Sequence, residues 1–427
     1  MHRDPLPQPI KRSLSAAASP HFFFLADAIA VANEPTPSQL EALERSYMAT
    51  GQFVMDSPEF KGLVLQVHAQ GSRAIGTLVR PRRERPEGFD VDIVIRLQRD
   101  ALVRFGNSPV RLINELHKVI ERYANAHGLA LTRWERCVTL EYADGMCVDL
   151  TPIVEDERFS IPHGGTHARV PDRELQLFDP TNPMGLVRTF DDAARVRANF
   201  TRQLIVKSSA MDSAAELVQL PNADQVQSRL LSRLVQLLKL HRNVKFGSAL
   251  NLDLSPRSVF VTSLAASAYV MRAPIAHESP LDLLLDIVAT MPLLFRRCSL
   301  PSGGEHWDLP NPTAPGDNLA SGMNAPGRQA AFLQWHASLV SDLERVIACI
   351  ERRAGQDVLQ TLVEQSFGKR AAQALQAATA PKAAPPNLPV TSLTSNIGTG
   401  RIVSVGTAIP SVTVAAPTRA HRFFGDQ

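Results

Sequence analysis

The alternation of hydrophobic and polar residues is clearest in residues 89–97, where it predicts a β-strand. Residues 134–142 and 146–154 show two further strand patterns, and Asp144-Gly145 between them is typical of a tight hairpin turn. A short strand is also expected at residues 77–79. The first 155 residues or so therefore contain a small, largely antiparallel sheet.

Longer stretches repeat hydrophobic residues every three or four positions, the spacing of amphipathic helices. The strongest is 225–245, where the leucines form a stripe and Lys239 lies near the C-terminal end. Further helices are expected from 37 to a break at 56–58, and at 59–70, 109–127, 258–271, 280–295, 329–353 and 358–380. The two halves of the chain thus differ, the first being mixed and the second helical.

These patterns divide the chain into four parts. Residues 1–35 form a loose N-terminal segment, 36–200 a mixed core, 201–380 a helical lobe and 381–427 a flexible tail rich in Ala, Pro and Thr. Within the core, residues 156–200 are irregular and suit a lid or a crossover. Residues 301–327, rich in Pro, Gly and Asn, form a long loop.

The apolar stretch at residues 22–32 has two interpretations. Basic residues precede it, as in a signal peptide, but Asp27 interrupts it and no small-residue cleavage site follows. The alternative is a short helix that packs its aromatic face on the body of the protein.

Composition narrows the function classes. The 427 residues are 44% hydrophobic and 20% charged, as expected of a globular protein with a large core, and the net charge of +3 argues against a bulk nucleic-acid coat or a stable DNA complex. No apolar run is long enough to span a membrane. Four cysteines without CxxC spacing indicate neither a zinc site nor a disulfide framework, so we expect a cytoplasmic location.

Asp90 and Asp92 carry the first chemical signal. They lie two apart in the strand at 89–97, so both carboxylates leave the same face while Val91, Ile93 and Ile95 point to the other. Carboxylates that close repel each other unless a divalent cation lies between them, and Mg²⁺ binds carboxylate and phosphate oxygens. A solvated strand face or a structural calcium site is the alternative.

A third carboxylate should lie nearby. Asp149, which follows three apolar residues on the returning hairpin strand, fits best, with Glu141 as its rival, whereas Asp144 belongs to the turn. Three carboxylates could hold two Mg²⁺ ions, with Mn²⁺ as a substitute. One ion would activate a sugar hydroxyl and the other would stabilise departing pyrophosphate.

Gly71-Ser72 supplies a candidate phosphate site. Glycine allows close backbone approach, serine adds a hydroxyl, and a following helix would direct N–H groups at an anion. A Gly-Ser pair alone is a weak signal for a phosphate site, but the Asp-x-Asp strand that follows it makes the signal more specific. Residues 80–85 contain four arginines that suit either a solvated loop or a ligand clamp. Lys239 could likewise be an ordinary surface lysine.

The order Gly71-Ser72, Thr77, Asp90-Val91-Asp92 and the run from Val148-Asp149 to Pro152 resembles the DNA polymerase β-like nucleotidyltransferases. More narrowly, over about residues 36–370 it resembles the bacterial cGAS/DncV-like enzymes (CD-NTases). Softer features also fit this family, namely Leu238-Lys239 before a loop, Ser258 at the start of the next helix, Asn311-Pro312 and Asp317-Asn318.

The resemblance implies an α+β fold with two lobes, in which a nucleotidyltransferase core and a helical lobe flank a cleft. Gly71, Ser72, Lys239 and Ser258 would bind the nucleotide, and Asp90, Asp92 and Asp149 would be the catalytic metal ligands. The activity implied is Mg²⁺-dependent joining of NTPs, ATP first among them, into a cyclic di- or trinucleotide second messenger for anti-phage defence (CBASS).

In some such systems a conjugating protein partner acts on the enzyme's C-terminus, and residues 421–425 on the flexible tail would suit it, although Asp426 and Gln427 follow the glycine. Three alternatives to the cyclic product stay open. They are a nucleotidyltransferase of the same core acting on RNA or protein, a non-catalytic nucleotide-binding protein, and a metal-stabilised binding module. The sequence leaves base choice, linkage and activation trigger undetermined.

Overall fold

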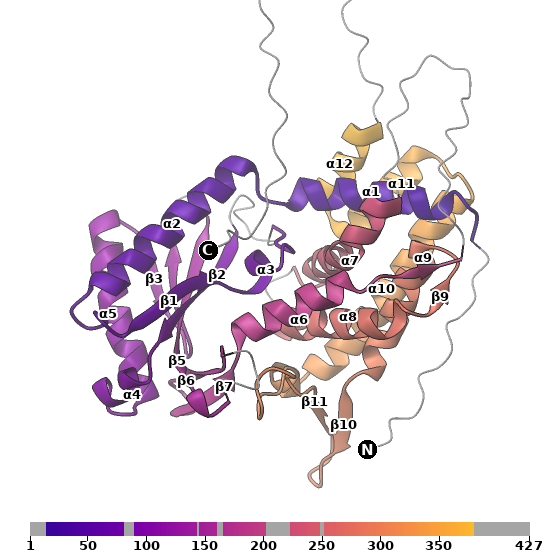
Figure 1. Ribbon diagram of the computed structural model, residues 1–427. Coiled ribbons are helices and arrows are strands. Elements are labelled where there is room, and N and C mark those ends of the chain that lie inside the picture. The colour runs from indigo at the N-terminus through magenta and orange to yellow at the C-terminus, as the bar shows by residue number, and fades with distance from the viewer. Residues whose placement is uncertain are drawn as a thin grey trace, which may run out of the picture. The chain divides into compact units, whose positions relative to one another are not determined.

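The computed structural model describes residues 14–80, 89–142, 145–159, 165–201, 223–247 and 252–379. Their elements form two packed groups, each with its own hydrophobic core: a sheet with helices, and a bundle of helices (Figure 1). In the described ranges, no helix combines the length and the hydropathy that a bilayer crossing requires.

A sheet of seven strands organises the first group among the described residues, in the order β1-β2-β5-β4-β3, with β6 added on β5 and β7 on β6. Within this sheet, β2 and β5 are the one parallel pair of described strands, and the other pairs are antiparallel. The expected mixed, largely antiparallel sheet is therefore confirmed. The strands are β1 (Val64–Ala69), β2 (Asp90–Leu97), β3 (Ala130–Arg133), β4 (Val138–Glu141), β5 (Cys147–Glu155), β6 (Ala168–Asp172) and β7 (Leu177–Thr181).

Helices α2 (Pro37–Asp56) and α5 (Pro109–His127) pack beside this sheet, and short helices α3 (Gly71–Ala74) and α4 (Asp100–Arg104) follow β1 and β2. Helix α5 begins where the sequence predicts, because the Ser108 hydroxyl caps it and Pro109 is its first residue. Its Leu116 and Ile120 share the core with Ile93 and Ile95 of β2. The opposite face of β2 is thereby left to its two aspartates.

Three expectations about this group are wrong. Residues 59–70 are not helical, since β1 forms there and pairs antiparallel with β2. Residues 156–200 are not irregular, because β6 and β7 extend the sheet and α6 (Pro183–Arg195) starts at an Asn182 cap. In both places pairing with distant residues overrides weak local preference. The short strand expected at residues 77–79 is wrong as well, since these residues belong to no strand in the structure.

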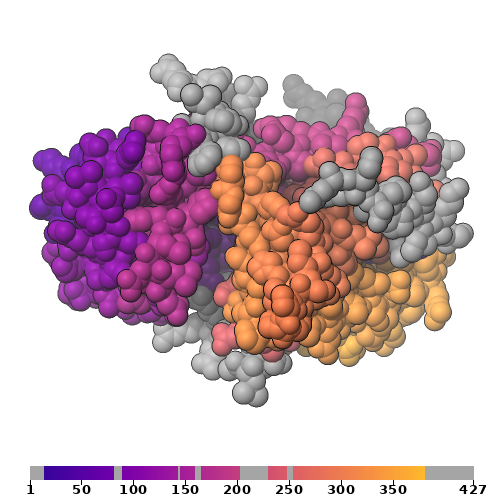
Figure 2. Space-filling model, turned by 90° about the horizontal axis from the view of Figure 1, so that it is seen from below, coloured from indigo at the N-terminus to yellow at the C-terminus, as the bar shows by residue number. Residues whose placement is uncertain are grey.

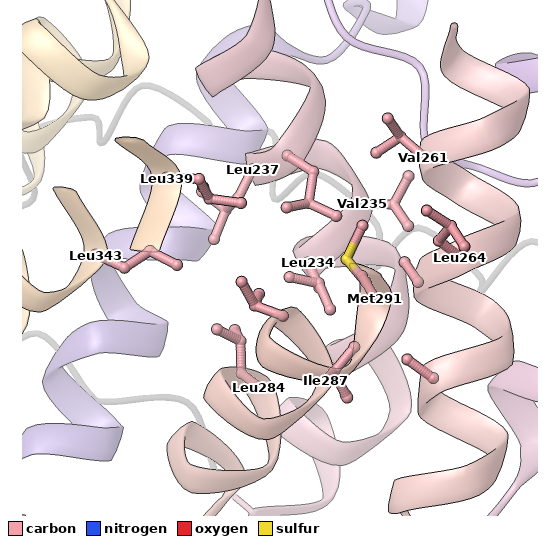
Figure 3. Packing of buried hydrophobic residues seen from close by; sticks show 14 of the residues in the cluster. Leu234, Val235, Leu237, Val261, Leu264, Leu284, Ile287, Met291, Leu339 and Leu343 are labelled. Atoms are coloured by element: carbon pink, nitrogen blue, oxygen red, sulfur yellow. The ribbon is translucent and has the colours of Figure 1, made fainter. Parts of the chain in front are cut away.

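The second group is built around α7 (Ala223–Lys245), which lies between its neighbours in Figure 3. Leu234, Val235 and Leu237 of α7 lie among apolar side chains of α8, α9 and α10, where Leu264, Ile287 and Leu339 are buried. The other helices are α8 (Ser258–Arg272), α9 (Pro280–Thr290), α10 (Arg328–Glu351), α11 (Gln356–Phe367) and α12 (Lys369–Thr379).

Helix α1 (Ala18–Asn33) corrects the expectation that residues 1–35 are loose. Phe22 and Phe23 are buried in the helical core, as in the packed-helix alternative for this stretch. Asp27, which interrupts the apolar run, accepts a hydrogen bond of 2.6 Å from the Arg233 side chain of α7. The segment therefore belongs to the helical group, although it precedes the sheet in sequence.

Smaller differences concern the connections. The strands β8 (Asn199–Phe200) and β9 (Ala276–His277) pair, so the chain has entered the helical group before residue 201. The expected loop at 301–327 includes β11 (Glu305–Asp308), which pairs with β10 (Arg296–Ser299). The helix expected at 358–380 is two helices, α11 and α12, because Gly368 has a φ of +94°. The tail at 381–427 lies outside the described residues.

His241 on α7 makes stability depend on pH. Its Nε2 lies 3.1 Å from Asp342, a carboxylate that Lys245 and Arg345 also contact. Burial lowers the pKa of His241 to about 4 and outweighs the opposing effect of Asp342. Because the unfolded histidine takes up a proton near pH 6.5, its stabilisation is complete above that pH and is lost as the pH falls toward 4.

Chemical unfolding should show this loss, of at most about 3 kcal/mol, between pH 6.5 and 4. His241→Gln keeps a group that can bond to Asp342 but does not titrate, so its free energy of unfolding should fall less over that range. Parallel curves for the variant and the wild type would exclude His241 as the responsible group.

Candidate active site

A cavity of about 1110 Å³ is lined by residues of both groups. On the face shown in Figure 2, indigo to magenta residues of the sheet group lie beside orange residues of the helical group. The cavity brings together all seven site residues that the sequence predicts, namely Gly71, Ser72, Asp90, Asp92, Asp149, Lys239 and Ser258.

The aspartates meet on one face of the sheet. Asp92 and Asp149 are partners in the register of the parallel strands β2 and β5, whose backbones lie about 5 Å apart. Asp90 is two residues earlier on β2 and therefore shares that face. Burial, followed by the charges of Asp149 and Asp90, raises the pKa of Asp92 to about 7. The three carboxylates thus form a strongly negative, partly desolvated wall.

A chain of hydrogen bonds holds Asp149. The Thr139 hydroxyl on β4 donates to the Asp149 carboxylate, and the Trp134 indole donates to Thr139 Oγ1 at 2.9 Å. Glu141, the rival third ligand, also lines the cavity, but it is opposite Cys147 and lies one strand farther from β2. Asp149 is therefore the carboxylate nearer to the Asp90/Asp92 pair.

Position 71 requires glycine for two reasons, namely its backbone conformation and its short distance to the Asp92 side chain. Its φ is +58°, in the left-handed region, and a Cβ there would lie 2.4 Å from Asp92 Oδ2. The backbone N–H of Gln70 donates to the carbonyl of Asp92 at 2.9 Å, which ties α3 to β2. The sequence therefore needs glycine at 71 to place Ser72 next to the carboxylates.

Lys239 links the two groups. It is only 3% exposed, which excludes the surface-lysine alternative. Its ammonium donates to Ser72 Oγ and Thr77 Oγ1, each at 2.8 Å, and to the Thr77 carbonyl at 3.2 Å. Burial and then the charge of Arg242 lower the pKa of Lys239 to about 7, while Asp92 opposes them. A buried cation so placed is suited to an anionic ligand in the cavity.

Arg242 and Arg257 line the cavity and are site residues that the sequence prediction omits. Arg242 Nη1 donates to Ser258 Oγ at 2.7 Å, and burial and then Arg257 lower the pKa of Arg242 to about 10. Arg257 directly precedes α8 and also lines the cavity. The signal for Arg242 was its position three residues after Lys239, on the same helix face.

Apolar side chains complete the cavity along helices α6 and α8. They include Leu186, Val187, Phe190, Val259, Ala266 and Val270. A polar end next to an apolar wall suits a ligand that joins a polyanion to a flat, weakly polar group.

Arg80, the described member of the arginine cluster at residues 80–85, does not line the cavity. Arg80 donates to Gln39 Oε1 at 2.8 Å and lies 4.7 Å above the Phe89 ring, so it packs within the sheet group. The other three arginines, at positions 82, 83 and 85, lie outside the described residues, as does Asp144.

The chemistry of the carboxylates suits Mg²⁺. No group of three or more acidic, His or Cys side chains in the described ranges has the spacing of a complete metal site. Mg²⁺ does not require such a cage, because it usually binds one or two carboxylates together with substrate phosphates and water. The crowded Asp92 and Asp149, and the close approach of Gly71 to Asp92, fit a cation completed by a bound nucleotide.

Comparison with known proteins agrees with this arrangement. Residues 25–193 match the family described as the Second Messenger Oligonucleotide or Dinucleotide Synthetase domain. A c-di-GMP synthase from Roseivirga ehrenbergii is 26% identical over 296 residues, which are 68% of this chain and 70% of the relative. The cyclic dinucleotide synthase CdnG from Bradyrhizobium diazoefficiens is 26% identical over 224 residues, 50% of this chain and 51% of the relative.

The fold itself has a solved counterpart. The structure of the CD-NTase CdnG from Bradyrhizobium diazoefficiens in complex with GTP superposes with a TM-score of 0.59. It covers 83% of this chain and 98% of its own, at 19% identity. A likeness at this identity establishes the shared fold, so the two-lobed arrangement expected from the sequence is confirmed.

Proposed function

We propose that this protein, a cGAS/DncV-like nucleotidyltransferase (CD-NTase), joins nucleoside triphosphates into a cyclic dinucleotide second messenger and releases pyrophosphate. The relatives named above are cyclic dinucleotide synthases, and their names favour a ring of two nucleotides over one of three. Signalling in anti-phage defence is the role that follows from the family.

One observation carries the proposal. Three carboxylates on the sheet face a buried lysine, an arginine and two hydroxyls within a single cavity. Negative charge on one wall suits cations, and the donors of the other wall suit a polyanion. A nucleoside triphosphate with its divalent ions satisfies both walls at once.

Each residue has a separate task in this scheme. Lys239, Ser72 and Ser258 bind the triphosphate, while Arg242 holds the Ser258 hydroxyl and adds positive charge. Asp90, Asp92 and Asp149 hold two Mg²⁺ ions, with Mn²⁺ as a substitute. When bound, Mg²⁺ supplies the charge that activates a ribose hydroxyl and offsets that of pyrophosphate. The apolar walls orient the bases so that the hydroxyl meets the α-phosphate in line.

We propose GTP as a substrate, because a relative is named c-di-GMP synthase and the fold's counterpart was solved with GTP. ATP, the first expectation from the sequence, stays a prediction, as do the cytoplasmic location and a protein partner for the tail. Ring closure requires the linear dinucleotide to reorient within the cavity, so that its free hydroxyl reaches the carboxylates for a second transfer.

Incubating the purified protein with GTP, with ATP and with their mixture, each with Mg²⁺, tests the function. Mass spectrometry should find a phosphatase-resistant cyclic dinucleotide, and EDTA should abolish it. Incorporation that depends on added RNA would support the rival transferase. No turnover with any NTP would support a non-catalytic nucleotide-binding protein.

A further inference from the structure

Trp134 lines the cavity, but it has no role in the mechanism proposed above. It follows β3, it is 54% exposed, and it lines the same cavity as Asp149 and Lys239. The other two tryptophans of the chain, Trp307 and Trp335, are buried in the helical group. A single exposed aromatic side chain is common on protein surfaces, so it is the location of Trp134 that is informative.

A hydrogen bond from its N–H fixes one edge of the Trp134 indole. Its N–H donates to Thr139 Oγ1 at 2.9 Å, and the Thr139 hydroxyl donates in turn to the Asp149 carboxylate. Indole has one donor and no acceptor, so this bond satisfies all of its polar capacity. The exposed remainder of Trp134 offers the cavity only aromatic surface.

Sheet order places this ring away from the triphosphate site. Ser72 follows β1, which pairs with β2, and Lys239 contacts Ser72 on that side. Trp134 lies between β3 and β4, on the far side of β2 and β5 in the sheet. The carboxylates therefore lie between the donor's phosphates and the indole. An acceptor whose hydroxyl reacts next to Asp149 has its base one sugar ring away, toward Trp134.

We propose that Trp134 forms the stacking platform for the nucleobase of the acceptor nucleotide and also positions Asp149 through Thr139. The inference rests on the proposed function. Stacking on an aromatic ring accepts any base, since every base has a π-face. The subsite therefore binds the acceptor firmly without choosing between purines. Trp134 touches substrate, whereas Thr139 is a positioning residue.

A single transfer step isolates the acceptor. A 2′,3′-dideoxynucleoside triphosphate has no ribose hydroxyl and serves only as donor. An α,β-methylene nucleoside triphosphate cannot release pyrophosphate and serves only as acceptor. The wild-type full chain should join them into a linear product. Trp134→Ala should raise KM for the acceptor roughly 10- to 100-fold and leave KM for the donor unchanged.

Conservative variants separate stacking from positioning. Trp134→Phe keeps a ring but loses the N–H, so KM for the acceptor should stay near the wild-type value while kcat falls. Thr139→Val removes both hydrogen bonds and should also lower kcat alone, and Thr139→Ser should restore it. Val103→Ala is the matched control, because Val103 is 79% exposed on α4 and does not line the cavity.

Fluorescence gives a readout that is independent of turnover. Because Trp307 and Trp335 are buried, binding of the acceptor analogue should quench Trp134 emission in the wild type, and the quenching should be absent from Trp134→Phe. An unchanged KM for the acceptor in Trp134→Ala, or an equal rise for the donor, would overturn the inference. Absence of transfer by the wild type would instead refute the proposed function.

Discussion

Replacing Asp92 with asparagine should lower kcat/KM for the cyclic product at least about 1,000-fold, a loss of about 4 kcal/mol of transition-state stabilisation. Asp92 is in register with Asp149 and lies against Gly71, at the centre of the carboxylate wall. Asparagine keeps the size of the side chain but removes the charge that binds Mg²⁺. Product formation from labelled GTP measures the loss.

The same variant should not lose stability. Without metal, Asp92 is a half-buried carboxylate next to two others, so asparagine removes repulsion and the midpoint of thermal unfolding in EDTA should stay or rise. Adding Mg²⁺ with nucleotide should raise the midpoint of the wild type but not of the variant. Asp56→Asn, an exposed site at the end of α2, is the control. Full activity in Asp92→Asn would contradict the metal assignment.

Replacing Lys239 with methionine should lower kcat/KM about 100- to 1,000-fold, the usual cost of losing one donor to developing phosphate charge. The ammonium bonds with Ser72 and Thr77, so it places the phosphate-binding turn as well as contacting the ligand. KM for the donor should rise most, because the triphosphate loses a buried cation. Steady-state kinetics with separate donor and acceptor analogues measure this effect.

Folding should be little affected by that change. Methionine has a similar length and needs no charge compensation, so the midpoint of thermal unfolding should stay near the wild-type value or rise. Lys118→Met removes an exposed lysine of α5 that does not line the cavity, and it should change neither activity nor stability. A parallel loss of activity and stability in Lys239→Met would indicate a structural role alone.

Local pattern accounts for the elements that were predicted well. Helix α5 has a cap, an initial proline and a strong apolar stripe, and β2 alternates between aspartates and buried apolar residues at 90–93. Residues 1–35 are not wholly loose and residues 59–70 are not helical, because α1 and β1 are stabilised by partners far along the chain. Asp27 pairs with Arg233 more than 200 residues away, and β1 is held as the strand that pairs with β2.

The candidate site likewise combines residues that local sequence spacing predicts with residues that only the fold brings together. Asp90 and Asp92 share a face because of their spacing alone. Arg242 and Trp134 have no distinctive motif, and their roles depend on α7 and the β3–β4 connection meeting at one cavity. Such residues become visible only when side-chain distances are known.

By itself the sequence determined the kind of chemistry, because a Gly-Ser turn, two aspartates on one strand face and a third on a hairpin follow from short-range spacing. Only the tertiary structure decided which third carboxylate faces that pair. Strand register places Asp149 rather than Glu141 next to Asp92, and register is set by non-local pairing. Only the fold, too, buries Lys239 opposite those carboxylates, because the helical and sheet groups must pack before residues 167 positions apart can meet.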